Sequence, residues 1–282
     1  MQPTTDAERN ASYLARPRRR PAPLRATVSE KTQLSLHLVR VTLTGPDLAG
    51  FNYPGPASHF KLVLPDPDVG ELLLPTPGDD GLVTLDGAPS LIMRTYTARA
   101  FRPGVNEVDV DVFLHGDGPA STWAATVRPG DTIAVTSPRR SGFHPPESAR
   151  WILLAADSSA IPAVATILEV ESHLPIRCVI EVDDARDRFE LPHHSSATVE
   201  WRTREADATP NSTLLSALHE DLAAGPGFCW VAGESGAIRQ ARTYLLTRDR
   251  LDRDSVVTRG YWRLGAVNHP DYDDGTDLVD NP

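Results

Sequence analysis

The chain has 282 residues, a formal net charge of −10 and a hydrophobic content of 40%. This length suggests two domains of ordinary soluble composition. The acidic balance argues against a nucleic-acid partner, which would need a basic surface. Apolar runs fall far short of the roughly 20 residues of a membrane span, and no secretory signal is visible, so we expect no integral membrane segment. Two cysteines exclude a disulfide scaffold, and a reducing, cytoplasmic location is expected.

The first half of the chain has a β pattern. Residues 1–20 lack apolar periodicity and are predicted to form a flexible tail. After them, Pro, Gly and Asp clusters separate six short apolar segments, with a short helix expected at 119–127. The strands are expected at 35–44, 59–64, 81–85, 93–100, 107–114 and 131–136. Short strands with turn signals between them predict a six-stranded antiparallel β-barrel.

From about residue 150, apolar strands alternate with helices. Strands are expected at 151–156, 177–182, 198–203, 228–232 and 255–261. Helices are expected from about 162 to 173, at 212–222 and at 235–248. This succession predicts a parallel α/β sheet, in which ligands bind outside the carboxyl ends of the strands. We expect domains at 21–147 and 148–265, an acidic C-terminal tail at 266–282 and a ligand cleft between the two domains.

One candidate binding segment reads Arg94-Thr95-Tyr96-Thr97. A guanidinium fork suits a phosphate, and a tyrosine ring can stack on a planar ring system. Side chains two residues apart on a strand face the same way, so Arg94 and Tyr96 could serve one ligand. An ordinary surface strand is the alternative that spacing alone leaves open.

A second candidate segment runs from a strand end at His115 through a glycine turn into a short helix. Gly118 and Ser121 would place backbone N–H groups and a hydroxyl at a helix N-terminus, which suits a pyrophosphate. A simple turn, with Ser121 as N-cap and Trp123 in the core, fits the same pattern.

In this order, the two segments resemble the flavin-binding half of the siderophore-interacting protein family, FAD-containing ferric-siderophore reductases of the ferredoxin-reductase superfamily. Further similar segments lie at 59–62, 155–163, 232–239 and 260–265. The resemblance covers about residues 24–265. It implies an FAD-binding β-barrel domain at 21–147 and an NAD(P)H-binding α/β domain at 148–265. Electrons would pass from NADPH or NADH through FAD to a ferric siderophore, which would release Fe(II).

The resemblance also implies roles for individual residues. The flavin phosphate and ring would be held by Arg94, Tyr96 and Thr97, with Asp111 and His115 near the ribose or adenine. The pyrophosphate would be cradled by Gly118, Ala120, Ser121, Thr122 and Trp123, and Thr95 and Phe113 would complete this part of the site. The nicotinamide side would be formed by Asp157, Ser159 and Ala160, with Gly233 and Glu234 closing over the dinucleotide. No catalytic acid–base residue and no resident metal are expected, because the cofactor supplies the chemistry.

The acceptor would be a bulky, anionic iron chelate, which requires a local basic pocket. The candidates are bases at strand ends that face the expected cleft: Lys61, Arg139, Arg140 and Arg263. The donor stays open between two nucleotides. Asp183 and Asp184 follow the second strand of the α/β domain, where an acid favours the ribose diol of NADH. The 2′-phosphate of NADPH, which we favour slightly, could be held by Arg186, Arg188, Arg202 and Arg204.

Two departures from the family pattern keep other functions open. Residues 137–141 read Ser-Pro-Arg-Arg-Ser where the family commonly has Gly-Pro-Arg-Gly-Ser, and Leu264 stands where the family has a second arginine. One alternative is a general NAD(P)H–flavin electron-transfer reductase. The other is a flavin- or siderophore-binding carrier without efficient turnover. In each case a monomer is expected.

Overall fold

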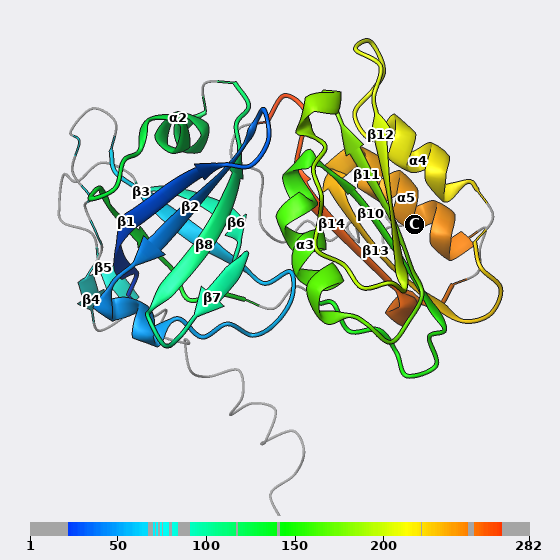
Figure 1. Ribbon diagram of the computed structural model, residues 1–282, viewed down its shortest axis with the longest axis horizontal. Helices are drawn as coiled ribbons and strands as arrows, with labels where there is room; N and C mark the ends of the chain where they lie inside the picture. Colours follow the sequence, from blue (N-terminus) through cyan, green and yellow to red (C-terminus); the bar gives the residue numbers. More distant parts are fainter. Residues whose placement is uncertain are drawn as a thin grey trace, which may run out of the picture.

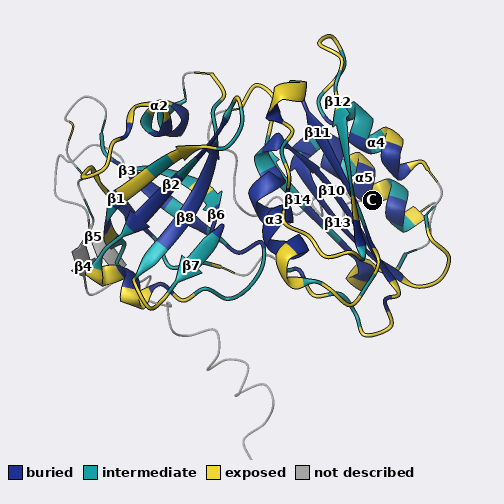
Figure 2. Cartoon of the chain, in the orientation of Figure 1, coloured by how far each residue is buried: buried dark blue, intermediate teal, exposed yellow. Residues whose placement is uncertain are grey.

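The computed structural model contains two large sheets that lie side by side (Figure 1), and a separate two-stranded sheet. It describes residues 22–66, 70, 72, 74, 76–78, 81–83, 91–116, 118–139, 142–220, 222–247 and 251–266. The first sheet is antiparallel and the second is parallel. Figure 2 shows that the buried residues concentrate in the strands of both sheets and in the helix between them.

The antiparallel sheet has seven strands in the order β6-β3-β9-β1-β2-β8-β7. Its members are β1 (Leu24–Gln33), β2 (Leu38–Thr44), β3 (His59–Leu64), β6 (Ile92–Thr97), β7 (Ala100–Arg102), β8 (Glu107–Phe113) and β9 (Thr132–Val135). Val108, Val110 and Val112 of β8 are fully buried, as their alternation predicts. Asp109 and Asp111 on the opposite face are buried too, because Arg102 and Arg40 neutralise them.

The six-stranded barrel prediction needs correction. The sheet has seven strands and two ends, β6 and β7, and no described residue pairs one end with the other. The predicted strand at 81–85 instead pairs as β5 (Gly81–Val83) with β4 (Thr76–Gly78) in a separate two-stranded sheet. The predicted strand at 93–100 splits into β6 and the start of β7. The short helix is present as α2 (Pro119–Thr126).

The parallel sheet has five strands in the order β12-β11-β10-β13-β14. The strands are β10 (Trp151–Asp157), β11 (Ile176–Val182), β12 (Ala197–Thr203), β13 (Gly227–Glu234) and β14 (Val256–Trp262), and the helices are α3 (Ile161–Val170), α4 (Ser212–Leu218) and α5 (Ser235–Thr247). Helix α3 packs on the face turned toward the antiparallel sheet, and α4 and α5 cover the other face (Figure 1). The predicted succession of strands and helices is confirmed.

Polar contacts join the two sheets. Arg99, just after β6, forms a two-pronged ion pair with Glu169 of α3, at 2.6 and 2.9 Å. Asp187, almost fully buried, accepts hydrogen bonds from Ser35 and His37 beside β2. These contacts fix the relative placement of the sheets. Among the described residues, no helix is long and apolar enough to cross a membrane.

Candidate functional site

A cavity of about 520 Å³ lies where the two sheets meet. The antiparallel sheet contributes the ends of β6 and β8 and the start of α2. The parallel sheet contributes the carboxyl ends of β10, β11, β12 and β14. This placement agrees with the expectation that ligands bind beyond the carboxyl ends of parallel strands.

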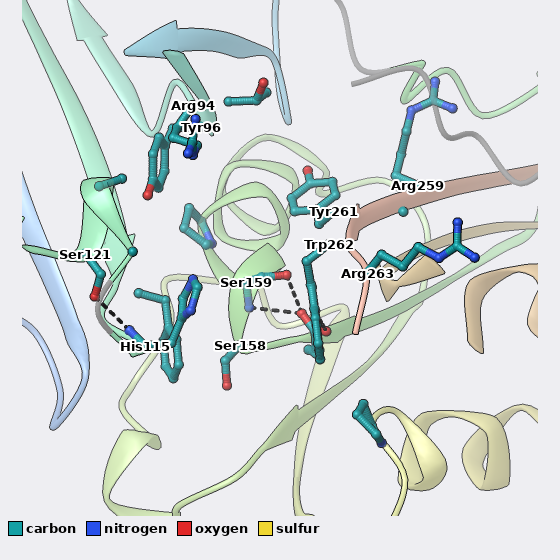
Figure 3. A pocket seen from close by; sticks show the side chains of 18 of the residues that line it. Arg94, Tyr96, His115, Ser121, Ser158, Ser159, Arg259, Tyr261, Trp262 and Arg263 are labelled. Carbon is teal, nitrogen blue, oxygen red and sulfur yellow. Dashed lines mark hydrogen bonds between the residues drawn. The ribbon is translucent and has the colours of Figure 1, made fainter. Parts of the chain in front are cut away.

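The predicted segment on β6 forms one wall of the cavity. Arg94, Thr95, Tyr96 and Thr97 all line it. Arg94 and Tyr96 lie together on this wall, as their two-residue spacing predicts (Figure 3). Burial raises the pKa of Tyr96 to about 12, so its hydroxyl stays protonated at neutral pH. The wall therefore offers one fixed cation and one neutral aromatic ring.

The start of α2 supplies the next part of the wall. Gly118, Ala120 and Ser121 line the cavity, and Gly118 is the N-cap residue without a side-chain cap. The first backbone N–H groups of this helix are therefore not satisfied by a capping side chain, which favours an anion there. Ser121 Oγ accepts a hydrogen bond of 2.9 Å from the His115 backbone N–H and holds the preceding turn.

Of the other residues predicted for the flavin side, some line the cavity and some do not. Asp111, Phe113 and His115 line the cavity. Asp111 is almost fully buried, and its two carboxylate oxygens accept from Arg40 at 2.7 and 2.8 Å. Two predicted residues lie off the main cavity: Trp123 packs against the core of the antiparallel sheet, and Thr122 lines a smaller hollow beside α2.

Asp157, at the end of β10, is the centre of a buried hydrogen-bond network. Its Oδ1 accepts from the Ser159 backbone N–H at 2.9 Å and from the Ser159 hydroxyl at 2.5 Å. Its Oδ2 accepts from Asn211 Nδ2 at 3.1 Å and from Trp262 Nε1 at 2.7 Å. Burial raises the pKa of Asp157, although these hydrogen bonds act in the opposite direction. The network places Ser159 and Trp262 on the cavity wall.

Gly233 makes this network possible without lining the cavity. It lies on β13, between β10 and β14, so the link from Asp157 to Trp262 passes over it. A Cβ atom at Gly233 would lie 2.4 Å from Asn211 Oδ1 and 2.8 Å from Asp157 Oδ2. The next residue, Glu234, accepts from the Leu264 backbone N–H at 3.2 Å and from Ala237 at 3.0 Å, which ties the loop after β14 to α5. The predicted residue Ala160 is buried behind the cavity wall.

The predicted acceptor bases are separated. Arg263 lines the cavity and is exposed. Lys61 and Arg139 do not line the cavity, but His59 does. His59 forms an antiparallel β-bridge with Arg139, and its side chain lies on the same face of β3 as Lys61. Arg140 lies outside the described residues.

Sequence reasoning missed several cavity residues, among them Glu181, Asn211 and Arg259. Glu181 is a charged residue near the end of an apolar strand, and this contrast was the available signal. Asn211 directly precedes α4, where a capping residue is typical. Arg259 lies on β14, and its contribution depends on strand register, which no short pattern specifies.

Two family models cover most of the chain. A siderophore-interacting FAD-binding domain matches residues 27–142, and the siderophore-interacting protein model matches 149–265. The chain belongs to the siderophore-interacting protein family. The predicted family is therefore confirmed.

Similar proteins match most of the chain. The ferric vibriobactin reductase ViuB of Vibrio cholerae is 33% identical, over 83% of this chain and 87% of that protein. The NADPH-dependent ferric-chelate reductase of Escherichia coli is 29% identical, over 84% of this chain and 91% of that protein. A siderophore utilization protein from T. fusca has a similar structure, with a TM-score of 0.76, 31% identity and coverage of 89% and 99%.

The fold is ferredoxin-reductase-like, as a TM-score of 0.56 to phthalate dioxygenase reductase at 14% identity shows. FAD also fits the residues present. The cavity brings together a guanidinium, an aromatic ring and an uncapped helix N-terminus, which match the phosphates and the planar ring of this cofactor. Arg94, Tyr96 and the start of α2 are the groups that would hold it.

Proposed function

We propose that this protein is an FAD-dependent ferric-siderophore reductase that takes electrons from NADH or NADPH. The observation that carries the proposal is one cavity with a wall suited to phosphates and a planar ring on one sheet and the carboxyl ends of four parallel strands, β10, β11, β12 and β14, opposite. The names of the V. cholerae and E. coli relatives support it, because both are ferric reductases. We assign the FAD-binding domain to 21–147 and the nucleotide-binding domain to 148–265.

The chain's own residues have binding and orienting roles in this proposal. Arg94 and the start of α2 bind the flavin phosphates, and Tyr96 packs against the ring. The turn at Asp157–Ser159 and the indole of Trp262 form the nucleotide side of the cavity. When bound, FAD supplies the conversion from a two-electron donor to a one-electron acceptor.

The acceptor side is the exposed end of the cavity. Arg263 attracts the anionic iron chelate, and Lys61 and Arg139 extend the basic surface past His59. Arg140 belongs to the same proposed group. Reduction of the substrate iron to Fe(II) weakens its bonds to hard, anionic oxygen ligands, so the chelate releases it. A protein acid–base pair is not required for that release.

The decisive experiment follows the visible spectrum of the FAD-loaded protein under anaerobic conditions. NADH or NADPH is added first, and a ferric siderophore with an Fe(II)-trapping dye follows. We expect flavin absorbance that bleaches with the nucleotide and recovers as the Fe(II) complex forms. Recovery of the flavin absorbance at a rate that does not depend on which iron chelate is added would favour a general electron-transfer reductase. Tight siderophore binding without bleaching would favour a carrier.

We also propose a cytoplasmic monomer without a nucleic-acid partner. The two buried cysteines, neither of them in a disulfide, support a reducing compartment. Sedimentation equilibrium tests the oligomeric state against the chain mass of 30.7 kDa.

A further inference from the structure

The far end of the cavity, at β11 and β12, contains an ion pair between Asp183 and Arg204. Arg204 Nε and Nη2 lie 2.9 and 2.7 Å from Asp183 Oδ1. Arg204 Nη1 also donates to the Ala208 carbonyl at 2.5 Å, and Glu181 lies 3.7 Å from the guanidinium. The Arg204 side chain is only 16% exposed. Its position is therefore fixed and its charge is already balanced by protein carboxylates.

Asp183, unlike Arg204, is largely exposed to the cavity. Its side chain is 65% exposed and lines the cavity. Both short contacts from Arg204 reach Oδ1 of this carboxylate. A carboxylate at the end of the second strand is the group that accepts hydrogen bonds from the two hydroxyls of an adenosine ribose.

The charge at this end of the cavity is negative. Three carboxyl groups, Asp157, Glu181 and Asp183, line it together with one guanidinium, Arg204. The other arginines considered for the donor do not line the cavity. Each has a partner elsewhere: Arg186 pairs with Asp184, Arg202 with Glu200 and Glu220, and Arg188 with Thr203. A 2′-phosphate would therefore meet a carboxylate where it needs a cation.

We propose that Asp183 selects NADH over NADPH as the electron donor. The inference rests on the proposed function, because it specifies which nucleotide that reductase uses. Asp183 would accept the ribose hydroxyls of NADH, and it would both repel the 2′-phosphate of NADPH and occupy the arginine that could bind it. Like charges placed together across a binding site cost enough to change affinity by about tenfold or more. Because the E. coli relative is named for NADPH, we expect the two proteins to differ in donor.

The test uses the FAD-loaded protein and two independent measurements. Titration calorimetry gives the Kd of NAD⁺ and NADP⁺, and anaerobic stopped-flow gives the rate of flavin bleaching by NADH and NADPH. We expect the wild type to favour the non-phosphorylated nucleotide by about tenfold or more in both. Asp183→Asn should reduce this preference at least about tenfold, mainly by tighter binding of NADP⁺.

Asp184→Asn is the matched control. Asp184 is the adjacent carboxylate, pairs with Arg186 at 2.6 Å and does not line the cavity, so the preference should not change. The double variant Asp183→Asn with Arg204→Gln should lose the gain in NADP⁺ binding. If Asp183→Asn does not fold, Asp183→Ser replaces it, with circular dichroism as the check of folding.

The proposal is overturned if the wild type binds NADP⁺ more tightly than NAD⁺, or if Asp183→Asn and Asp184→Asn give equal effects. A different result separates it from the proposed function. If neither nucleotide bleaches the flavin but NAD⁺ still binds in an Asp183-dependent way, the role of Asp183 in nucleotide selection holds and the reductase assignment fails. If neither nucleotide binds, both fail.

Discussion

Arg263 is an exposed cation that lines the cavity on the side proposed for the iron chelate, so its charge can be tested separately from packing. We expect Arg263→Ala to raise KM for an anionic ferric siderophore several-fold, because long-range attraction to the chelate is lost. The kcat with a neutral quinone acceptor should stay nearly constant. Steady-state kinetics with both acceptors measures this difference.

The control for Arg263 is Arg186→Ala, an exposed arginine that does not line the cavity. It should change neither KM nor kcat. An equal loss of rate with the siderophore and the quinone in Arg263→Ala would remove Arg263 from the acceptor site.

The buried carboxyl group of Asp157 should make the free energy of unfolding depend on pH. Burial raises its pKa above the ordinary value of 3.8, so the folded protein keeps this proton to higher pH than the unfolded chain does. The free energy of unfolding therefore falls as pH rises from 3.8 through the raised pKa. Asp157→Asn lacks this titration, so the stability of the wild type relative to the variant should decrease across that window. Urea unfolding at a series of pH values measures the difference.

Asp184→Asn provides the contrast. The hydrogen bonds and charge of Arg186 lower the pKa of Asp184 to about 2, so its stabilising contribution is lost only as pH falls toward that value. Above about pH 5, where this carboxyl is ionised in both the folded and the unfolded chain, the difference between this variant and the wild type should stay constant. A slope of the same sign in both variants would show that the Asp157 carboxyl is not the source.

At the scale of the elements, Gly233 on β13 leaves room for the hydrogen bond between Asp157 of β10 and Trp262 of β14. Gly233→Ala would place a methyl group against Asn211 Oδ1 and Asp157 Oδ2, which are held in the buried network. We expect a loss of about 1–3 kcal/mol in unfolding free energy from overpacking, together with weaker nucleotide binding. Gly104→Ala is the control, because no atom lies within 4 Å of its added Cβ. Unfolding and nucleotide titrations on both variants test this; equal stability would contradict it.

Strands with strong local patterns were predictable, and strands that depend on pairing were not. β8 has a strict alternation of apolar and acidic residues and β10 has an apolar run, and each pattern marks its strand in isolation. β1 was missed, since only Ala26 and Val28 of its ten residues are buried and a bulge interrupts its pairing with β2. β7 has three residues and exists only through its pairing with β8. Whether a sheet closes into a barrel depends on such pairings between distant strands, so local turn signals could not predict whether this sheet closes.

The residues of the candidate site likewise fall into those that local spacing predicts and those that depend on tertiary packing. Arg94 and Tyr96 follow from their spacing on one strand, and the cavity contains both. Asn211 could not be placed from the sequence, because it reaches Asp157 only through the packing of the loop before α4 against β10 and β11. The charge balance of Arg204 likewise depends on which neighbouring strand ends next to it.

At the scale of the whole molecule, the cavity exists because polar contacts hold the two large sheets in a fixed position relative to each other. Arg99 joins β6 to α3 through Glu169, and Tyr261 of β14 reaches Thr97 of β6 through its buried hydroxyl. Both contacts lie beside cavity-lining segments. A ligand that binds to the cavity should therefore stabilise the two sheets together and not one alone.

This coupling predicts how FAD affects thermal stability. A ligand that binds only the folded protein adds about 2.7 kcal/mol at a concentration of 100 Kd, so Tm should rise with FAD concentration. Arg94→Ala removes a charge-assisted phosphate contact of about 1.5–3 kcal/mol, so the FAD needed for the same rise in Tm should increase at least about tenfold. Differential scanning calorimetry should show one transition that moves as a unit.

The matched control is Arg128→Ala, an exposed arginine after α2 that does not line the cavity. Its Tm should follow the same FAD dependence as the wild type, because no cavity contact is lost. Two transitions, of which FAD moves only the earlier or the later one, would show that the sheets unfold independently. An unchanged FAD dependence in Arg94→Ala would instead place the flavin phosphates elsewhere, because a guanidinium that binds them cannot be removed without a loss of affinity.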